Sequence, residues 1–233
     1  MLFFWLIIVT VFWTVFFSSI ILLTFPFDFT GGRFLNNLIR LWARLIFASV
    51  GIKVKINGLS NLDLNKNYIF APNHSSSLDI PLMLGFTPLW LVPIAKKELR
   101  WIPFLGWAMK LAGHIFIDRS NHDKAMESLN KIKISINKKP RSILIFPEGS
   151  RTNNGQLKRF KSGGLTLGIK TGFDIVPVLI SGTYRSLKKG SMGFSRNLLT
   201  IDFGIPIKIE NYSEEQRKSL SEKVFNEVKK MQK

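Results

Sequence analysis

The chain contains no cysteine among its 233 residues. Disulfide bonds and thiolate metal sites are therefore excluded, and the composition is compatible with a reducing compartment. Histidine is also scarce, with three residues and no H-E-x-x-H pair, so the sequence predicts no metal site and no cofactor. A G-x-S-x-G nucleophile elbow is missing as well, which argues against a serine nucleophile.

Acidic residues are few. The chain has 15 aspartates and glutamates against 33 lysines and arginines, which gives a formal net charge of +18. Such a balance favours an anionic partner, namely nucleic acid, a lipid headgroup surface or an acidic carrier protein. The charge is spread along the chain and no familiar nucleic-acid-binding module is present, so we expect no nucleic acid. A membrane-tethered nucleic-acid-binding protein stays the alternative of another class.

Charged side chains are absent from residues 1–27. As a helix this run would be roughly 40 Å long, against about 30 Å for the hydrocarbon core of a bilayer. It is long enough to span with tilt, or to bend near Ser18 and Ser19 and enter one leaflet. A secretory signal peptide is disfavoured, because a basic n-region and a small-x-small cleavage site are lacking. We therefore predict a membrane-anchoring helical segment over residues 1–50.

Basic residues begin just after this apolar run, at Arg33, Arg40 and Arg44. The positive-inside rule then places the body of the protein on the cytoplasmic side of the membrane. With Asn36 and Asn37 these arginines recur at helical spacing, opposite an apolar stripe. The pattern is typical of an amphipathic helix at a membrane surface, and a helix that packs on the core fits it equally well.

Short apolar runs alternate with helical patterns from about residue 51 onward. We expect strands over residues 52–56, 68–71, 91–95, 114–118, 142–146, 175–180 and 199–203. Most of these runs are continuously apolar, as in the buried strands of a covered sheet. Helices are expected over residues 126–136 and after the capping box Ser213–Gln216. The sequence therefore predicts one α/β domain over residues 51–233, with a mostly parallel central sheet flanked by helices.

His74 and Asp79 directly follow the second predicted strand. A carboxylate can fix the tautomer of an imidazole, whose other nitrogen is then free to take a proton from a substrate hydroxyl. Five residues of ideal helix rotate by about 140° beyond one turn, so the two side chains meet only if His74 precedes the helix. We expect one of the serines at 75–77 to be the N-cap and Asp79 to lie in the first turn. A capped helix start with an incidental histidine is the alternative.

Two arginines follow later strands. Arg119 follows the predicted strand 114–118, and Arg151 lies in a turn that Pro147 and Gly149 shape. A guanidinium matches the geometry of a phosphate, although Arg119 paired with a nearby aspartate at the surface is the alternative. Ligands gather at the carboxyl ends of the strands in open α/β sheets, so we expect these loops and the His74 loop to line one cleft.

Two other features have open interpretations. Glu148 is positioned to hold an arginine or to receive a hydrogen bond from a substrate hydroxyl. The apolar stretch Trp101–Ala112 fits a membrane surface or an acyl groove, and core packing is at least as compatible with it.

The order of four segments resembles the glycerolipid acyltransferases, and most closely the bacterial 1-acyl-glycerol-3-phosphate, or lysophosphatidic acid, acyltransferases. The four segments are residues 74–79, 113–119, 146–152 and 175–180, and further matches lie at residues 95–99, 101–106 and 160–163. The resemblance covers residues 50–210. Each segment alone is weak, whereas four in this order are specific.

The resemblance implies direct acyl transfer without an acyl-enzyme. His74 would deprotonate the sn-2 hydroxyl of lysophosphatidic acid while Asp79 orients it, and the donor would be acyl-CoA or acyl-carrier protein. The product would be phosphatidic acid, made for phospholipid biosynthesis at the membrane lipids. By the same resemblance the glycerol phosphate site would comprise Lys96, Arg119, Glu148, Gly149 and Arg151.

Developing charge on the thioester carbonyl needs hydrogen-bond donors, and backbone amides near the start of the His74 helix are candidates. Two further alternatives stay open. One is a sister O-acyltransferase that acts on another lysolipid, such as a lyso-aminolipid. The other is a lipid-binding scaffold without activity.

Overall fold

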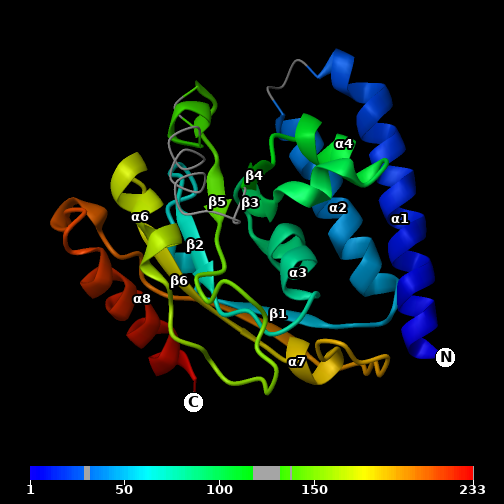
Figure 1. Ribbon diagram of the computed structural model, residues 1–233. Helices are drawn as coiled ribbons and strands as arrows, with labels where there is room; N and C mark the ends of the chain where they lie inside the picture. Colours follow the sequence, from blue (N-terminus) through cyan, green and yellow to red (C-terminus); the bar gives the residue numbers. More distant parts are fainter. Residues whose placement is uncertain (29–31, 118–131, 137, 233) are drawn as a thin grey trace.

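A single mixed sheet with helices on both faces forms the body of the molecule (Figure 1). The computed structural model describes residues 1–28, 32–117, 132–136 and 138–232. The predicted strand end at Asp118, the candidate Arg119 and most of the predicted helix 126–136 lie outside these residues. Within them the predicted α/β class is confirmed.

The sheet of the described residues has seven strands in the order β1-β7-β6-β2-β5-β3-β4. Their bounds are β1 Val54–Asn57, β2 Ile69–Pro72, β3 Leu91–Lys96, β4 Ile115–Ile117, β5 Ser142–Leu144, β6 Ile175–Ser181 and β7 Leu199–Phe203. Each of them overlaps one predicted strand, and the differences are confined to one or two residues at the ends, where apolar patterns are least informative.

Five strands of this sheet run parallel to one another. β6, β2, β5, β3 and β4 pair in parallel, whereas β7 is antiparallel to β6 and carries β1 alongside it. The predicted mostly parallel sheet is therefore confirmed. Because β2 lies between β5 and β6, the segments that leave the carboxyl ends of these three strands meet at one edge of the sheet.

Alternate residues of the strands face two separate cores. Phe70 of β2 joins a cluster with α2 (Arg33–Ser49) and α3 (Asp79–Phe86). Its neighbour Ile69 joins a cluster with α6 (Ser162–Thr171) and α8 (Arg217–Met231) on the other face. Both side chains are fully buried. Full burial of an aliphatic or aromatic side chain contributes about 1.5–3 kcal/mol to the free energy of unfolding. Burial on both faces therefore fixes the position of β2 and of the residue at which the next segment begins.

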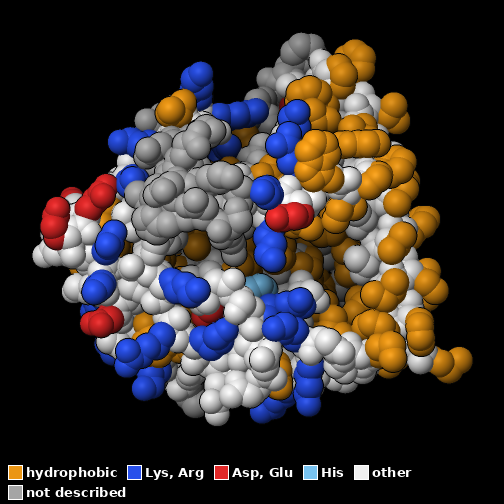
Figure 2. Space-filling view, in the orientation of Figure 1, with side chains coloured by type: hydrophobic (Ala, Val, Ile, Leu, Met, Phe, Trp, Pro, Cys, Tyr) orange, Lys and Arg blue, Asp and Glu red, His pale blue; other side chains and the backbone are white. Residues whose placement is uncertain are grey.

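The N-terminal helix α1 (Leu2–Thr24) is unbroken through Ser18 and Ser19, so of the two expected arrangements the bend at these serines is not formed. With the short 3-10 helix η1 (Phe25–Phe27) it forms a 26-residue segment whose most apolar 18-residue window has a mean hydropathy of 2.6, and which is long and apolar enough to cross a membrane. It lies along one side of the molecule (Figure 1), and the space-filling view shows that this side is covered with apolar side chains (Figure 2).

Helix α2 lies between α1 and the body of the molecule. The Trp42 indole N–H donates to Thr14 Oγ1 at 3.2 Å, and the Trp13 indole N–H donates to Ser49 Oγ at 3.0 Å. These bonds fasten α1 along the length of α2. The membrane-surface interpretation of α2 stays a prediction, because Phe34 and Leu41 of α2 are exposed although α1 packs along this helix.

The polar side of α2 faces α3 and β3. The Arg44 Nε–H donates to the carbonyl of Gly85 at 2.8 Å, and an Arg40 guanidinium N–H donates to the carbonyl of Pro88 at 2.9 Å. These carbonyls lie at and beyond the C-terminal end of α3, where a cation also complements the helix dipole. The periodic arginines thus mark a helix that packs on the domain, which was the second interpretation of the pattern.

The C-terminal helix α8 begins at Arg217, later than the predicted capping box indicates. One half of the box is formed, since the Ser213 N–H donates to Gln216 Oε1 at 2.9 Å. One face of the helix packs on the core, with Leu220, Val224 and Val228 fully buried.

Residues 97–111 form the 3-10 helix η3 (Lys97–Trp101) and helix α4 (Leu105–Leu111). Only small residues of this stretch, such as Gly106 and Ala108, are buried, whereas Trp101 is 75% exposed and Trp107 is also exposed. Core packing is therefore wrong for its large side chains. They extend the apolar surface of α1, against which α4 packs.

The turn between β6 and α7 (Thr183–Ser186) depends on Gly182, which has a φ of +86°. A Cβ there would lie 2.2 Å from the Leu198 carbonyl oxygen, so Gly182→Ala combines backbone strain with a clash. We expect it to lower the free energy of unfolding by about 3 kcal/mol or more. Urea denaturation in detergent measures this.

Gly190→Ala is the matched control. Its φ is +75°, and no atom lies within 4 Å of the added Cβ. It should cost only about 1–2 kcal/mol, the contribution of the backbone alone. Equal losses in the two variants would show that the close approach of Leu198 does not constrain the turn.

Candidate active site

The segment that leaves β2 is fixed to β6 by the side chain of Asn73. Its Nδ2–H donates to the Ile180 carbonyl at 3.0 Å, and its Oδ1 accepts the Ile180 N–H at 2.7 Å. The buried amide thus satisfies backbone groups of β6 that a longer β2 would have paired. The backbone is thereby released from the sheet at His74.

Asp79 holds three donors with one carboxylate oxygen. Its Oδ2 lies 2.8 Å from His74 Nδ1 and accepts the N–H groups of Ser75 at 2.7 Å and of Ser76 at 2.8 Å. The Asp79 side chain is 0% exposed and that of His74 is 13% exposed. An ionised Asp79 places the proton of neutral His74 on Nδ1, which leaves Nε2 as the basic nitrogen.

The predicted contact between His74 and Asp79 is therefore present, but the predicted serine cap is wrong. The N-cap of α3 is Leu78, without a side-chain hydrogen bond, and Asp79 is the first helical residue. Two of the serines instead bind the segment between β2 and α3 to residues that follow β6. The Ser76 hydroxyl donates to the Leu187 carbonyl at 2.7 Å, and Ser75 Oγ lies 3.0 Å from Thr183 Oγ1.

Residues 146–152, which we call the β5 loop, hold the backbone of His74 from the other side. The His74 N–H donates to Glu148 Oε1 at 3.0 Å, and the His74 carbonyl accepts the Thr152 N–H at 2.9 Å. The Phe146 ring stacks on the imidazole, with ring centroids 3.9 Å apart and an interplanar angle of 25°. The predicted convergence of this loop and the His74 segment is confirmed by these contacts.

The same hydrogen bonds remove three of the backbone amides that were candidates to bind a thioester carbonyl. The N–H of His74 is bound to Glu148, and the N–H groups of Ser75 and Ser76 are bound to Asp79. An amide that already serves a buried carboxylate is not free to bind a developing oxyanion. These three amides therefore hold the base in place rather than stabilise the reaction.

Glu148 is buried, with 3% of its surface exposed. Burial raises the pKa of Glu148 to about 7, Asp79 adds to the rise, and the His74 N–H and Lys158 oppose it. Its Oε1 accepts a backbone N–H, so among the described residues the arginine of the first interpretation is not its partner.

The other residues expected at a phosphate site lie on segments that leave the same edge. Lys96 is exposed at the end of β3, and Gly149 is exposed in the β5 loop with a φ of +76°. Arg151 is half-buried, next to the Thr152 that contacts His74, and makes no hydrogen bond or ion pair with other described residues. Arg119 lies outside the described residues. The described structure thus places Gly149 and Arg151 beside the base.

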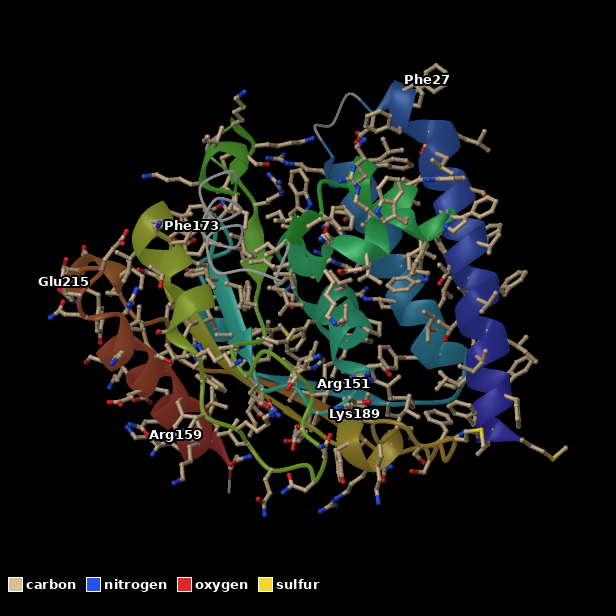
Figure 3. All side chains as sticks on the ribbon, in the orientation of Figure 1. Phe27, Arg151, Arg159, Phe173, Lys189 and Glu215 are labelled. Atoms are coloured by element: carbon tan, nitrogen blue, oxygen red, sulfur yellow. The ribbon has the colours of Figure 1, made fainter. Side chains whose placement is uncertain are left out.

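Sequence reasoning did not single out a second group of cations at this edge. Residues 150–161 and 182–198 each contain four lysines and arginines and no acidic residue. The two segments are joined where Lys189 Nζ donates to Asn153 Oδ1 at 3.0 Å and the Tyr184 hydroxyl donates to the Asn153 carbonyl at 2.9 Å. Figure 3 shows Arg151 near Lys189. Two long intervals without acidic residues, 149–173 and 175–201, were the signal available in the sequence.

Lysine and arginine side chains gather over the middle and lower parts of the face in Figure 2, beside the apolar side formed by α1. Among the residues that the structure describes, no group of three or more metal-ligating side chains is suited to a metal ion. The arrangement offers a base, an anion-binding surface and an adjoining apolar surface.

Comparison with known proteins identifies this combination. The sequence matches the family described as "Acyltransferase" over residues 53–181. The chain belongs to the acyltransferase family. The match includes His74, Asp79 and the whole β5 loop.

Several relatives are named 1-acyl-sn-glycerol-3-phosphate acyltransferases. The relative from Cocos nucifera is 34% identical over 203 residues, which cover 87% of this chain and 65% of the relative. The relative from Saccharomyces cerevisiae is 35% identical over 181 residues, which cover 77% of this chain and 59% of the relative. The acyltransferase chain thus spans less than two thirds of the length of these two relatives.

A crystal structure of the 1-acyl-sn-glycerophosphate (LPA) acyltransferase PlsC from Thermotoga maritima has the same fold. The TM-score is 0.82 at 28% sequence identity, and the superposition covers 99% of this chain and 94% of that one. The likeness therefore extends over α1 and α2 as well as over the acyltransferase domain.

The raised pKa of Glu148 predicts a pH-dependent stability. A carboxyl group with a folded pKa of about 7 and an ordinary value of 4.5 favours the fold while it is protonated. Its contribution is complete below pH 4.5 and is lost as the pH rises through 7. Relative to Glu148→Gln, the wild type should lose about 3 kcal/mol of unfolding free energy over this interval.

Chemical denaturation of both proteins in detergent at several pH values between 4.5 and 8 checks this. Glu148→Gln is the matched variant, because it keeps the size of the side chain and an oxygen acceptor. A difference in unfolding free energy that stays constant with pH would contradict the assigned titration.

Proposed function

We propose that this protein transfers a fatty acyl group from an acyl thioester to the sn-2 hydroxyl of 1-acyl-sn-glycerol-3-phosphate, giving phosphatidic acid. The observation that carries the proposal is the His74–Asp79 pair, whose Nδ1–Oδ2 distance is 2.8 Å and whose Nε2 is left as the base. The names of the relatives support this acceptor.

The reaction needs one base and no covalent enzyme intermediate. His74 Nε2 takes the proton of the sn-2 hydroxyl while the oxygen attacks the thioester carbonyl carbon. The tetrahedral intermediate collapses, the carbon–sulfur bond breaks, and the thiolate takes the proton back from His74. Asp79 keeps the ring in one tautomer and stabilises the imidazolium between the two proton transfers.

The phosphate monoester of the acceptor is bound by cations of the same edge. Arg151 is suited to this role because it lies beside the base and has no partner among the described residues. We propose Lys96 and Arg119 as further cations of this site and Gly149 as the turn that admits the headgroup. A phosphate bound at Arg151 places the nearby glycerol hydroxyl against His74.

The donor is acyl-CoA or acyl-carrier protein, as the thioester chemistry requires. Both carry negative charge, which the two segments without acidic residues attract. Helix α1 is the proposed anchor at the membrane, with residues 1–50 as the anchoring unit and residues 51–233 as the acyltransferase domain. We place the domain on the cytoplasmic side of a bacterial-type inner membrane, where the anionic lipid surface attracts the +18 charge.

Acyl transfer by the purified protein in detergent tests the function. Lysophosphatidic acid and a panel of other lysolipids are supplied with acyl-CoA and, separately, with acyl-carrier protein. Formation of phosphatidic acid supports the proposal, and acylation of another lysolipid alone would assign the sister activity. Lipid binding without any transfer would favour a scaffold.

Removal of the base should remove the reaction. His74→Ala is expected to abolish transfer, and Asp79→Asn to lower kcat by about 10²–10⁴-fold, since the amide no longer fixes the tautomer. Steady-state kinetics of folded variants, verified by circular dichroism, measure this. Turnover by His74→Ala at the wild-type rate would exclude His74 as the base.

The phosphate assignment predicts a change in KM. Arg151→Ala should raise the KM for lysophosphatidic acid by about 10-fold or more, with kcat largely kept, because a charge-assisted hydrogen bond is removed. Arg159→Ala is the matched control, since Arg159 lies on the same segment but on the side near α8 (Figure 3). An unchanged KM in Arg151→Ala would rule out its contact with the phosphate.

A further inference from the structure

The Glu148 carboxylate is turned inward, beneath the segment that carries the base. Its Oε1 accepts the His74 N–H at 3.0 Å. Its Oε2 is buried and has no hydrogen-bond partner among the described residues. A phosphate that approaches from solvent would meet the exposed Gly149 and Ser150 first.

One loop thus holds both polar groups of the His74 backbone and one face of its ring. Glu148 binds the N–H, Thr152 binds the carbonyl at 2.9 Å, and the Phe146 ring stacks on the imidazole at 3.9 Å. The loop is itself closed by a bond from the Gly149 N–H to the Phe146 carbonyl at 3.0 Å. Glu148 is the only member of this loop whose side-chain oxygen reaches the His74 backbone among the described hydrogen bonds.

A carboxylate is also poorly suited to a phosphate monoester, because two like charges repel at close range. The charged groups that act on Glu148 are Asp79 and Lys158. Lys158 Nζ is itself bound to Ser150 Oγ at 2.8 Å, on the exposed side of the loop.

We propose that Glu148 is a positioning residue for His74 and takes no part in phosphate binding. The inference rests on the proposed function and revises one residue of the expected phosphate site. By accepting the His74 N–H, Glu148 fixes the backbone position of His74. That position sets where the imidazole lies between Asp79 and the substrate. With a pKa of about 7, the Glu148 carboxyl group titrates near neutral pH.

Three variants separate positioning from phosphate binding. Glu148→Gln keeps an oxygen that can accept the His74 N–H. Glu148→Asp keeps the charge but withdraws it by one methylene, and Glu148→Ala removes the acceptor. For the Asp and Ala variants we expect kcat to fall by about 10²-fold, because a displacement of about 1 Å has such an effect. The KM for lysophosphatidic acid should stay at the wild-type value, and Glu148→Gln should restore kcat to within about 10-fold of wild type.

Two kinetic outcomes would overturn the proposal. A raised KM with unchanged kcat in Glu148→Asp and Glu148→Gln would assign the carboxylate to the headgroup. A kcat in Glu148→Gln as low as in Glu148→Ala would show that an acceptor at this position does not suffice. Arg151→Ala is measured in the same experiment as the reference, because it shows how far KM rises when a phosphate contact is lost.

An NMR measurement separates failure of this inference from failure of the proposed function. In ¹⁵N-labelled protein, the His74 amide resonance should shift in Glu148→Asp and titrate in the wild type with a midpoint near pH 7. It requires no turnover, and it also serves if Glu148→Ala does not fold. A wild type without transferase activity counts against the proposed function, whereas a His74 amide insensitive to Glu148 overturns the positioning role.

Discussion

The hydrogen bonds of a single buried carboxylate oxygen organise the active site. Asp79 Oδ2 accepts the His74 ring N–H and two backbone amides, all at 2.7–2.8 Å. A fully buried carboxylate is stable only when it is compensated in this way, and the geometry that compensates it also orients the base. The chain can meet this requirement only where a strand ends, because the amides of a sheet or a helix interior are already paired.

The sequence predicted the positions of the strands more completely than the partners that individual side chains bind. Continuous apolar runs such as residues 175–180 mark strands covered on both faces, so all seven strands were predicted within one or two residues. The arginines of α2 show the limit of such patterns. A periodic polar face indicates that polar groups lie opposite it without identifying them, and two of its arginines here bind the carbonyl groups of Gly85 and Pro88.

The candidate site shows the same division. The pairing of His74 with Asp79 followed from chemistry and spacing, whereas the partners that fix their loop did not. Glu148 binds the backbone of His74, which is 74 positions away in the sequence. Asn73 binds the backbone of Ile180, which is 107 positions away. Any residue can supply a backbone N–H or carbonyl group, so the sequence does not identify the partner in a hydrogen bond of this kind. For the same reason the serines could be taken as helix caps, although two of them bind the segment after β6.

The stacking of His74 on Phe146 has a consequence for the moment when the base holds the proton. At 3.9 Å and 25° the imidazolium would lie over the electron-rich face of the phenyl ring. Such an interaction stabilises a cation by about 0.5–2 kcal/mol. In the proposed reaction, the Phe146 ring would therefore help to hold the imidazolium in place between its formation at the alcohol and the transfer of its proton to the departing thiolate.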